Sequence, residues 1–312
     1  MDKTDWQLVK RRTADAEGAV FVSPDGRRYR RTGGAALRQE AAFQQKVAAL
    51  DYPVARVLAQ GEQDGGGFFV EEESLGPRSL HEMAVADGGQ ELPDAVVDQL
   101  AQVSARLVYA QAQHPAGADP GALHRWVEQA GWTHNVFAEN PDFDTPRTHA
   151  VLQRVRDELA AQRLVWGHLD YGLPNVLPDG VIDWQHHGVV PLGYDVALAL
   201  EVIPFKGGAK GYTASPAQRE RYLAALDSAA LAADAEPVSA HRGAFLVVKS
   251  LFFLALMRPA DPTRLDKHQK WQYRRHLFLK GLEQYERTGD VDTVLFPTLD
   301  QFAVGPGGSD GP

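Results

Sequence analysis

Residues 163–184 read RLVWGHLDYGLPNVLPDGVIDW. Within them, residues 176–182 form two short β-prone runs joined by a Pro-Asp-Gly turn, a pattern that predicts a β-hairpin. Asn175 comes directly before this hairpin and Asp183 directly after it. Because the two ends of a hairpin lie side by side, both side chains are expected to face one point. Asp170, on the loop that precedes the hairpin, lies within reach of the same point.

Two carboxylates and an amide in this arrangement suggest a site for a divalent cation and a phosphate. Their oxygens are hard ligands, which suit Mg²⁺ when it also binds substrate phosphates. A carboxylate outside the metal shell can accept the proton of an attacking hydroxyl group. Phosphoryl transfer needs this combination of metal-holding side chains and one aspartate that orients the nucleophile.

The chain before this stretch predicts a small sheet with one helix. Short β-prone runs up to about Gly76 are separated by turns, and Pro24-Asp25-Gly26 between two of them is a hairpin signal. Residues 36–51 have the apolar spacing of a helix. The order strand, strand, strand, helix, strand, strand indicates an antiparallel sheet that carries one helix.

The composition shifts near Gly76-Pro77, after which the chain is mostly helical except for the strand-like, turn-rich residues 163–183. Apolar residues at spacings of three and four predict helices at residues 94–114, 121–136, 147–162, 217–232, 241–257 and 265–288. The sequence therefore predicts a small β-rich lobe and a larger helical lobe, and a ligand is expected between them.

Composition excludes several classes of protein. The chain has 312 residues and 41 acidic against 32 basic side chains, a net charge of −9 that argues against a nucleic-acid groove or an anionic membrane as partner. Without cysteine there is no disulfide, thiolate zinc site or cysteine nucleophile. The most apolar stretch, residues 243–257, is too short to span a bilayer and contains Lys249, which favours a buried core helix. We expect a cytoplasmic protein.

The spacing H-x-D-x-x-x-x-N that starts at His168, followed by the Ile-Asp-Trp aspartate, resembles the catalytic and metal-binding segment of the aminoglycoside phosphotransferase family. That family is similar in fold to the eukaryotic protein kinases. The resemblance implies that Asp170 is the catalytic base and that Asn175 and Asp183 hold Mg²⁺. It also implies that His168 braces the loop and that Asp195, in a Tyr-Asp-Val-Ala run, supports the site from below.

Two features of the N-terminal region resemble the same family. Arg31-Thr32 stands where the family carries a strand lysine and threonine. Glu40 falls inside the apolar arc of the next helix, where a carboxylate needs a cationic partner such as Arg31. The resemblance implies that Arg31, set by Glu40, steadies the nucleotide phosphates, although an arginine does not have the geometry of a lysine.

The remaining candidate nucleotide-binding residues also come from the resemblance. Gly18 is the single glycine of the loop at residues 14–18 that would cover the nucleotide. The FFVEEESLG run at residues 68–76 resembles the hinge strand whose backbone meets adenine, which makes Glu72 and Ser74 candidates.

The resemblance implies an α+β, protein-kinase-like fold with a small antiparallel β-rich N-lobe and a larger, mainly helical C-lobe. Residues 1–75 would form the nucleotide-binding lobe. Residues 76–304 would form the helical lobe with the catalytic and metal-binding loops and the acceptor pocket. Residues 305–312 would be a disordered tail.

The leading hypothesis is an O-phosphotransferase that uses ATP or GTP with Mg²⁺ to phosphorylate a hydroxyl of a small molecule. The acceptor would be an aminoglycoside, an amino alcohol or a sugar-like compound, and it could be cationic. Arginine in place of lysine leaves open a catalytically weak, pseudokinase-like nucleotide-binding module. A third alternative is a metal-dependent hydrolase, with ligands drawn from His168, Asp170, Asp183 and either His186 or His187.

Overall fold

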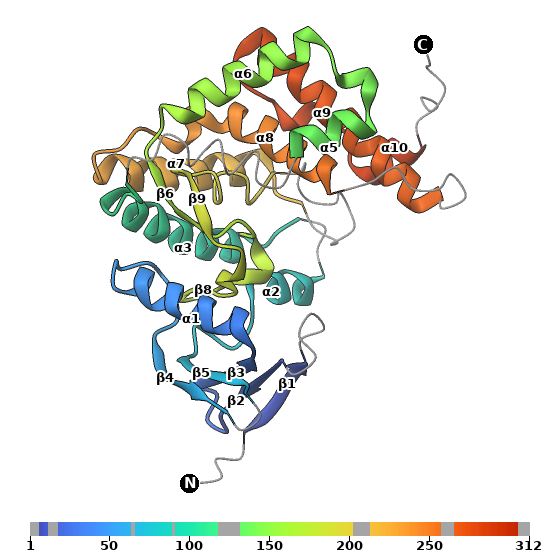
Figure 1. Ribbon diagram of the computed structural model, residues 1–312. Helices are drawn as coiled ribbons and strands as arrows, with labels where there is room; N and C mark the ends of the chain where they lie inside the picture. Colours follow the sequence, from blue (N-terminus) through green and yellow to red (C-terminus); the bar gives the residue numbers. More distant parts are fainter. Residues whose placement is uncertain are drawn as a thin grey trace.

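The computed structural model describes residues 6–11, 18–63, 66–88, 91–117, 132–201, 213–256 and 265–304. In these residues a small β-rich lobe with one helix lies against a larger, mainly helical lobe (Figure 1). This is the α+β arrangement that the sequence predicts. Residues 121–131 of the helix expected over 121–136, the loop residues 14–17 and the expected disordered tail lie outside the described residues.

The small lobe is built on one antiparallel sheet with the strand order β1-β2-β3-β5-β4. The strands are β1 (Gln7–Arg11), β2 (Ala19–Val22), β3 (Arg28–Gly33), β4 (Val57–Glu62) and β5 (Phe68–Glu73). The predicted turn between β2 and β3 is present. Gly26 adopts φ +70° there, and the Ser23 hydroxyl donates to the Asp25 carboxylate over 2.6 Å.

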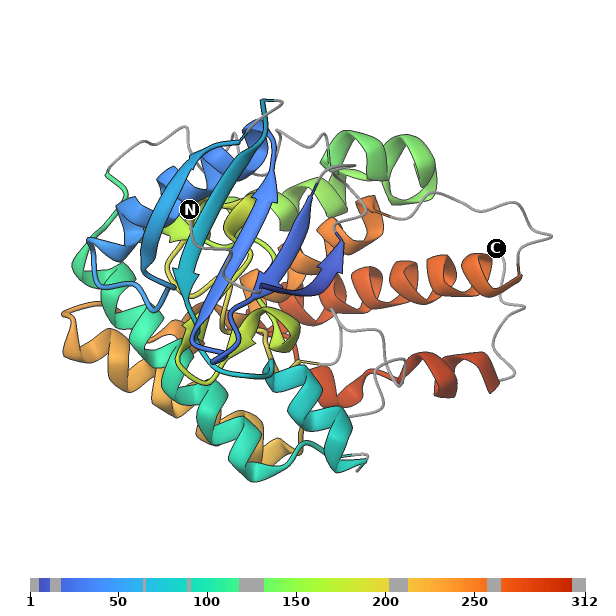
Figure 2. The ribbon, with the colours of Figure 1, turned by 90° about the horizontal axis from the view of Figure 1, so that it is seen from below.

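The single helix of this lobe, α1 (Ala35–Ala48), lies between the sheet and the helical lobe (Figure 1). Figure 2 looks from below onto the opposite face of the sheet. Leu37 and Ala41 of α1 pack against Phe68 and Val70 of β5, and Phe43 belongs to the main core, which extends into the helical lobe. One helix therefore packs into both lobes, as its broad apolar arc predicts.

The larger lobe consists mostly of helices around the main hydrophobic core. They are α2 (Leu80–Asp87), α3 (Asp94–Gln113), α5 (Trp132–Glu139), α6 (Pro146–Ala160), α7 (Pro216–Ala232), α8 (Arg242–Ala255), α9 (Leu265–Thr288) and α10 (Leu299–Val304). Short strands and 3₁₀ turns interrupt them: η1 (Pro141–Phe143), β6 (Leu164–Gly167), η2 (Leu173–Asn175), β7 (Val176–Leu177), β8 (Gly180–Val181), η3 (Trp184–His186), β9 (Gly188–Pro191), η5 (Val238–His241) and η6 (Thr293–Leu295).

Helix α2 is an element that the sequence analysis missed. Its apolar pattern is weak, but Ser79 and Glu82 form a capping box in which each side chain accepts a hydrogen bond from the other residue's backbone N–H. The Ser-x-x-Glu spacing was the available signal. The helix ends at Gly88, which takes the left-handed conformation with φ 72°.

Helix α8 occupies the position predicted for a buried core helix. By length and composition alone, residues 238–255 could cross a membrane, but 61% of this stretch is buried inside the protein. Phe245, Leu246 and Leu251 are among its buried side chains. The apolar stretch is thus accounted for by packing in the core.

The hairpin β7–β8 joins the two lobes. The Val181 N–H donates to the Pro53 carbonyl over 2.7 Å, and the Asp179 N–H donates to the Leu75 carbonyl over 2.9 Å. At Gly180 an added Cβ would lie 2.3 Å from the Pro53 carbonyl oxygen. Only glycine allows the small lobe to approach the hairpin this closely.

Replacing Gly180 with alanine is expected to lower the free energy of unfolding by about 1–3 kcal/mol, because the new methyl group meets rigid backbone. Gly34→Ala is the control, since an added Cβ there has nothing within 4 Å. Urea denaturation of both variants checks this. Equal losses in the two variants would contradict the close approach at Gly180.

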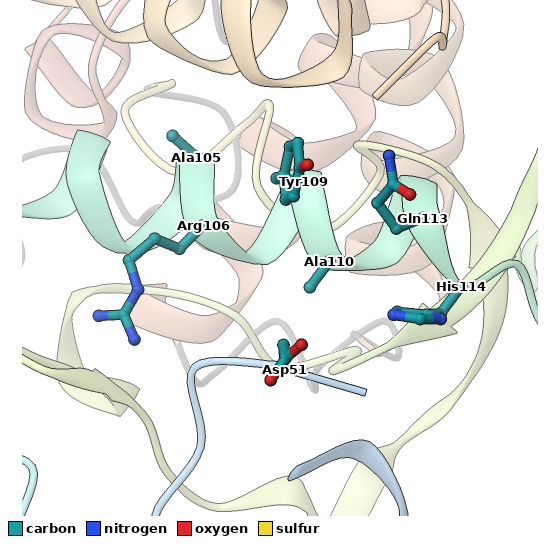
Figure 3. Close-up of a pocket in the computed structure, with 7 residues that line it drawn as sticks. All are labelled: Asp51, Ala105, Arg106, Tyr109, Ala110, Gln113 and His114. Carbon is teal, nitrogen blue, oxygen red and sulfur yellow. The ribbon is translucent and has the colours of Figure 1, made fainter. Parts of the chain in front are cut away.

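A hollow of about 510 Å³ lies between α3 and the loop after α1 (Figure 3). Asp51 faces α3 across it, and Arg106, Tyr109 and His114 are among the residues that line it. None of the residues predicted to bind substrate, nucleotide or metal lines this hollow. It belongs to the joint between the lobes.

Candidate active site

The loop that carries Asp170 is held by a buried carboxylate beneath it. Asp195, 3% exposed, accepts from the backbone N–H of His168 over 2.5 Å and from that of Leu169 over 3.0 Å. Leu169 has φ 66°, a left-handed conformation that disfavours most side chains. The two hydrogen bonds to Asp195 hold the loop in this conformation, although the residue is not glycine.

His168 connects this loop to the hairpin. Its Nδ1 accepts from the Asp170 N–H over 3.2 Å, so its Nε2 carries the proton and donates to the Ile182 carbonyl over 2.8 Å. Burial lowers the pKa of His168, against the opposing charge of Asp195. A neutral imidazole with both nitrogens occupied braces the loop and has no lone pair left for a metal.

Asn175 lies in contact with Asp170. The Asn175 Nδ2 donates to the Asp170 carbonyl over 2.8 Å and to the Asp170 carboxylate over 3.2 Å. The backbone carbonyl of Asn175 accepts a hydrogen bond from the Ile182 N–H over 3.0 Å. With Nδ2 occupied by Asp170, the amide oxygen is the atom of Asn175 that remains for a cation.

Asp183 ends the hairpin on the side of Asn175, because Val176 and Val181 are paired in register. It adopts φ 66° and ψ 57°, a left-handed conformation that aspartate tolerates better than most residues. A carboxylate and an amide oxygen here form a hard-oxygen donor set that fits Mg²⁺. Asn175 and Asp183 are the residues that would hold the ion.

The donors of the hydrolase alternative are not brought together. Among the described residues there is no group of three or more His, Cys, Asp and Glu side chains that could hold a metal ion. His187 directs its Nδ1 at the Trp184 carbonyl over 2.7 Å and stacks on Phe43 at 3.6 Å between ring centroids. His186 is exposed. This geometry gives the hydrolase hypothesis no support.

Arg31 and Glu40 form the ion pair that the sequence predicts, and its environment is more elaborate than expected. Arg31 Nη1 donates to Glu40 over 2.5 Å, while its Nη2 donates to Gln44 over 3.0 Å and to Glu72 over 3.1 Å. Arg31 Nε lies 3.1 Å from the second Glu72 oxygen. All four side chains are buried.

Two carboxylates therefore surround one guanidinium. Burial alone would lower the pKa of Arg31, but the charges of Glu72 and Glu40 outweigh it and raise that pKa. The contacts to Glu40, Glu72 and Gln44 occupy the guanidinium, so its surroundings differ from those of a cation free to grip phosphate. Glu40 continues the network by accepting from the Trp184 N–H over 3.1 Å, directly after Asp183.

The other predicted nucleotide-binding residues lie around the same sheet. Glu72 contributes its side chain to the Arg31 network, which the sequence analysis did not anticipate. Ser74 follows β5, where its N–H donates to the Arg27 carbonyl over 2.9 Å and its hydroxyl accepts from the Gly76 N–H over 3.2 Å. Gly18 is buried directly before β2, and the rest of its loop lies outside the described residues.

Two residues of this region were missed. Gln44 completes the Arg31 network and also donates to the Ala55 carbonyl over 2.7 Å. Its position one turn after Glu40 on the same helix face was the available signal. Tyr29 pairs with Glu72 across β3 and β5, so its ring lies on the same face of the sheet as Arg31.

A family model described as the phosphotransferase enzyme family matches residues 9–238. The chain belongs to this family. The match covers more than half of the chain, including the sheet, α1, the loop with Asp170 and the hairpin. No curated protein sequence matches the chain.

Solved structures show the same fold. A protein of Ralstonia eutropha JMP134, provisionally described as an aminoglycoside phosphotransferase, is 14% identical with a TM-score of 0.56 and covers 89% of this chain and 93% of its own. Aminoglycoside phosphotransferase APH(4)-Ia is 16% identical with a TM-score of 0.54, covering 89% and 94%. A thermostable mutant of it, in a ternary complex with AMP-PNP and hygromycin B, is 17% identical with a TM-score of 0.50.

The fold of this family member is therefore protein-kinase-like, as predicted. It is a kinase-type phosphotransferase. At such low identities the structural likeness extends to the fold alone.

Proposed function

We propose that this phosphotransferase moves the γ-phosphoryl group of ATP or GTP to a hydroxyl of a small molecule, in the cytoplasm and with Mg²⁺. The observation that carries the proposal is the contact between Asp170 and Asn175 beside the hairpin that ends in Asp183. A structural neighbour, APH(4)-Ia, was solved with AMP-PNP and hygromycin B. This supports the proposal that the present protein binds a nucleotide and a small-molecule acceptor.

The proposed reaction balances as a single in-line transfer. The acceptor oxygen forms a bond to the γ-phosphorus while the bond from that phosphorus to the β–γ bridging oxygen breaks, and the nucleoside diphosphate leaves. The hydroxyl proton passes to the exposed carboxylate of Asp170. Mg²⁺ on Asn175 and Asp183, when bound, supplies charge neutralisation to the phosphate oxygens.

Arg31 would act by positioning rather than by gripping phosphate. Its ion pair with Glu40 links β3 to α1, and Glu40 in turn holds the backbone next to Asp183. Tyr29, half-buried on the same face, offers a ring on which a base can stack.

Arg31→Met is expected to lower the free energy of unfolding by about 3–5 kcal/mol, because it leaves two buried carboxylates without a cation. Arg38→Met is the control, since Arg38 makes an ion pair with Glu62 at 2.6 Å in which its side chain is 54% exposed. The control loss should stay below about 1 kcal/mol. Urea denaturation measures both, and similar values would contradict the positioning role.

A second candidate function is a nucleotide-binding module with little turnover. The contacts of Arg31 with Glu40, Glu72 and Gln44 favour this function. They occupy the guanidinium that stands where the family resemblance places a phosphate-binding lysine. Such a protein would be stabilised by nucleotide without consuming it in the presence of any acceptor.

A coupled screen for nucleotide consumption distinguishes the two functions. Aminoglycosides, amino alcohols, sugars and hydroxy acids are offered with ATP or GTP and Mg²⁺, and mass spectrometry of the acceptor looks for one added phosphoryl group. Phosphorylated acceptor is the expected result. Nucleotide binding without consumption over the whole panel would favour the second candidate and overturn the transferase proposal.

A further inference from the structure

Lys249 is a buried cation in the middle of α8. It is 5% exposed, on a helix whose neighbouring positions are almost all apolar core residues. Its Nζ lies over three aromatic rings, 5.1 Å from the centroid of Tyr194, 5.8 Å from that of Phe253 and 6.0 Å from that of Phe252. Rings of this kind stabilise a cation without neutralising it.

The lysine lies close to the loop with Asp170. Tyr194, the ring it faces, directly precedes Asp195, and the charges of both Asp195 and Asp170 act on Lys249. Burial lowers the pKa of Lys249 despite these two carboxylates. Both carboxylate oxygens of Asp195 accept hydrogen bonds from the backbone, one from the N–H of His168 and one from that of Leu169. In the described part of the chain, Lys249 makes no direct ion pair.

A second cation shares Phe253 with Lys249. Arg274 of α9 lies over the Phe253 ring at 5.1 Å and donates from Nη1 to the Phe253 carbonyl over 2.5 Å. Burial lowers its pKa to about 10, and no carboxylate of the described residues forms an ion pair with it. Phe252, Phe253 and Arg274 are only partly buried, so this side of the group is open to solvent, whereas Lys249 itself is buried.

The group of Lys249, Phe252, Phe253 and Arg274 is called the cation cluster here. It places two positive charges on adjacent helices, and among the described residues their partners are aromatic rings and one carbonyl near the end of α8. Desolvated charges are costly unless an opposite charge accompanies them. A carbonyl at the end of α8 offers a partial charge only. An anion bound beside the cluster would stabilise both charges.

The acidic side chains near the end of the chain do not supply a site for a cation. Glu283 is exposed and pairs with Lys280 at 2.8 Å, and Asp290 pairs with Arg242 at 2.8 Å. Asp266 is exposed on the first turn of α9, and Asp261 lies outside the described residues. The described acids of this region are thus paired or solvated, whereas neither Lys249 nor Arg274 forms an ion pair with a described carboxylate.

We propose that the acceptor of this phosphotransferase carries an anionic group, such as a carboxylate, which Lys249 and Arg274 bind while its hydroxyl faces Asp170. This inference rests on the proposed function and deepens it by naming the acceptor class. It assigns Lys249 and Arg274 as specificity-determining residues. The acceptor is then a hydroxy acid or a sugar acid and not a polycationic aminoglycoside.

Turnover with matched acceptors tests the charge preference. Glycerol, 3-amino-1,2-propanediol and glycerate, and likewise glucose, glucosamine and glucuronate, differ mainly in charge within each series. The anionic member is expected to have a kcat/KM at least tenfold above the others. Lys249→Met should raise its KM at least tenfold and leave the nucleotide KM unchanged, with partial rescue by Lys249→Arg. Lys280→Met, an exposed lysine, is the matched control.

Two results of the turnover assay would overturn the proposal. One is a preference for the neutral or cationic members. The other is a Lys249→Met variant whose nucleotide KM rises while its acceptor KM does not, since the cation would then serve the phosphate of the nucleotide.

Anion binding is measured separately from turnover, so that failure of the transferase function is distinguishable. The unfolding temperature of the intact protein, saturated with Mg²⁺ and nucleotide, is followed in sodium sulfate against sodium chloride of equal ionic strength. Sulfate should raise the unfolding temperature of the wild-type protein more than that of the Lys249→Met/Arg274→Met variant. Without sulfate, Lys249→Met should melt no lower than wild type, because methionine fills the same space without charge. Equal sulfate effects in both proteins would overturn the proposal even if phosphoryl transfer is confirmed.

Discussion

An Asp170→Asn variant is expected to transfer phosphate about a hundred to ten thousand times more slowly than the wild-type protein. Asparagine has the size of aspartate but cannot accept the proton of the acceptor hydroxyl. The exposed Asp170 side chain contacts Asn175, while its backbone N–H is held by His168, so the loop should keep its shape. Coupled nucleotide consumption with an acceptor identified by the screen measures the loss in kcat.

Asp179→Asn provides the matched control for this variant. Asp179 lies at the exposed turn of the same hairpin, and its backbone makes the contacts there. Removing its charge should leave kcat within about twofold. Stabilisation by nucleotide and Mg²⁺ should be the same in all three proteins. An Asp170→Asn variant with wild-type turnover would show that another group takes the proton.

The contact between Asp170 and Asn175, and the position of Asp183 at the end of the hairpin, could be predicted from sequence because they are local. A Pro-Asp-Gly turn between β-prone runs brings its two flanks together whatever the rest of the protein does. Asn175 and Asp170 are in contact in the structure, and the backbone of Asn175 is bonded to the residue before Asp183. Most helices were predictable for the same reason, since apolar spacing depends only on neighbouring residues.

The partners of Arg31 could not be predicted as fully, because they come from distant parts of the chain. The apolar arc of α1 identified Glu40 as a buried carboxylate, nine residues from Arg31. Glu72 is 41 residues away and reaches Arg31 only through the pairing of β3 with β5. The cation cluster is another such case, since α8 and α9 meet by packing that no local pattern encodes.

The loop at Leu169 shows how a left-handed backbone is accommodated at a residue other than glycine. Its conformation would suit glycine. In this chain the Leu169 side chain lies over Gly188, where an added Cβ would be 3.0 Å from Leu169 Cδ1. Asp195 holds the backbone at the same time. A neighbouring glycine and a buried carboxylate thus allow leucine where sequence alone suggests strain.

The proposed metal site is tested best by Asp183→Asn, which should abolish the part of nucleotide stabilisation that depends on Mg²⁺. Asparagine tolerates the left-handed conformation of residue 183, φ 66° and ψ 57°, so the variant removes charge without adding backbone strain. Alanine would remove the charge and also add backbone strain. The Trp184 N–H would still donate to Glu40, which preserves the joint with α1.

The expected effect follows from binding linkage. Nucleotide at about 100 times its Kd adds about 2.7 kcal/mol to the wild-type free energy of unfolding, which is a rise of several degrees in Tm for a chain of this size. With Mg²⁺ present, Asp183→Asn should show only the smaller rise that wild type shows in EDTA. Because Asp170→Asn should keep the full rise, the pair of variants separates metal binding from proton transfer. If Asp183→Asn responds to Mg²⁺ and nucleotide as wild type does, the cation is held elsewhere and Asp183 is a turn residue.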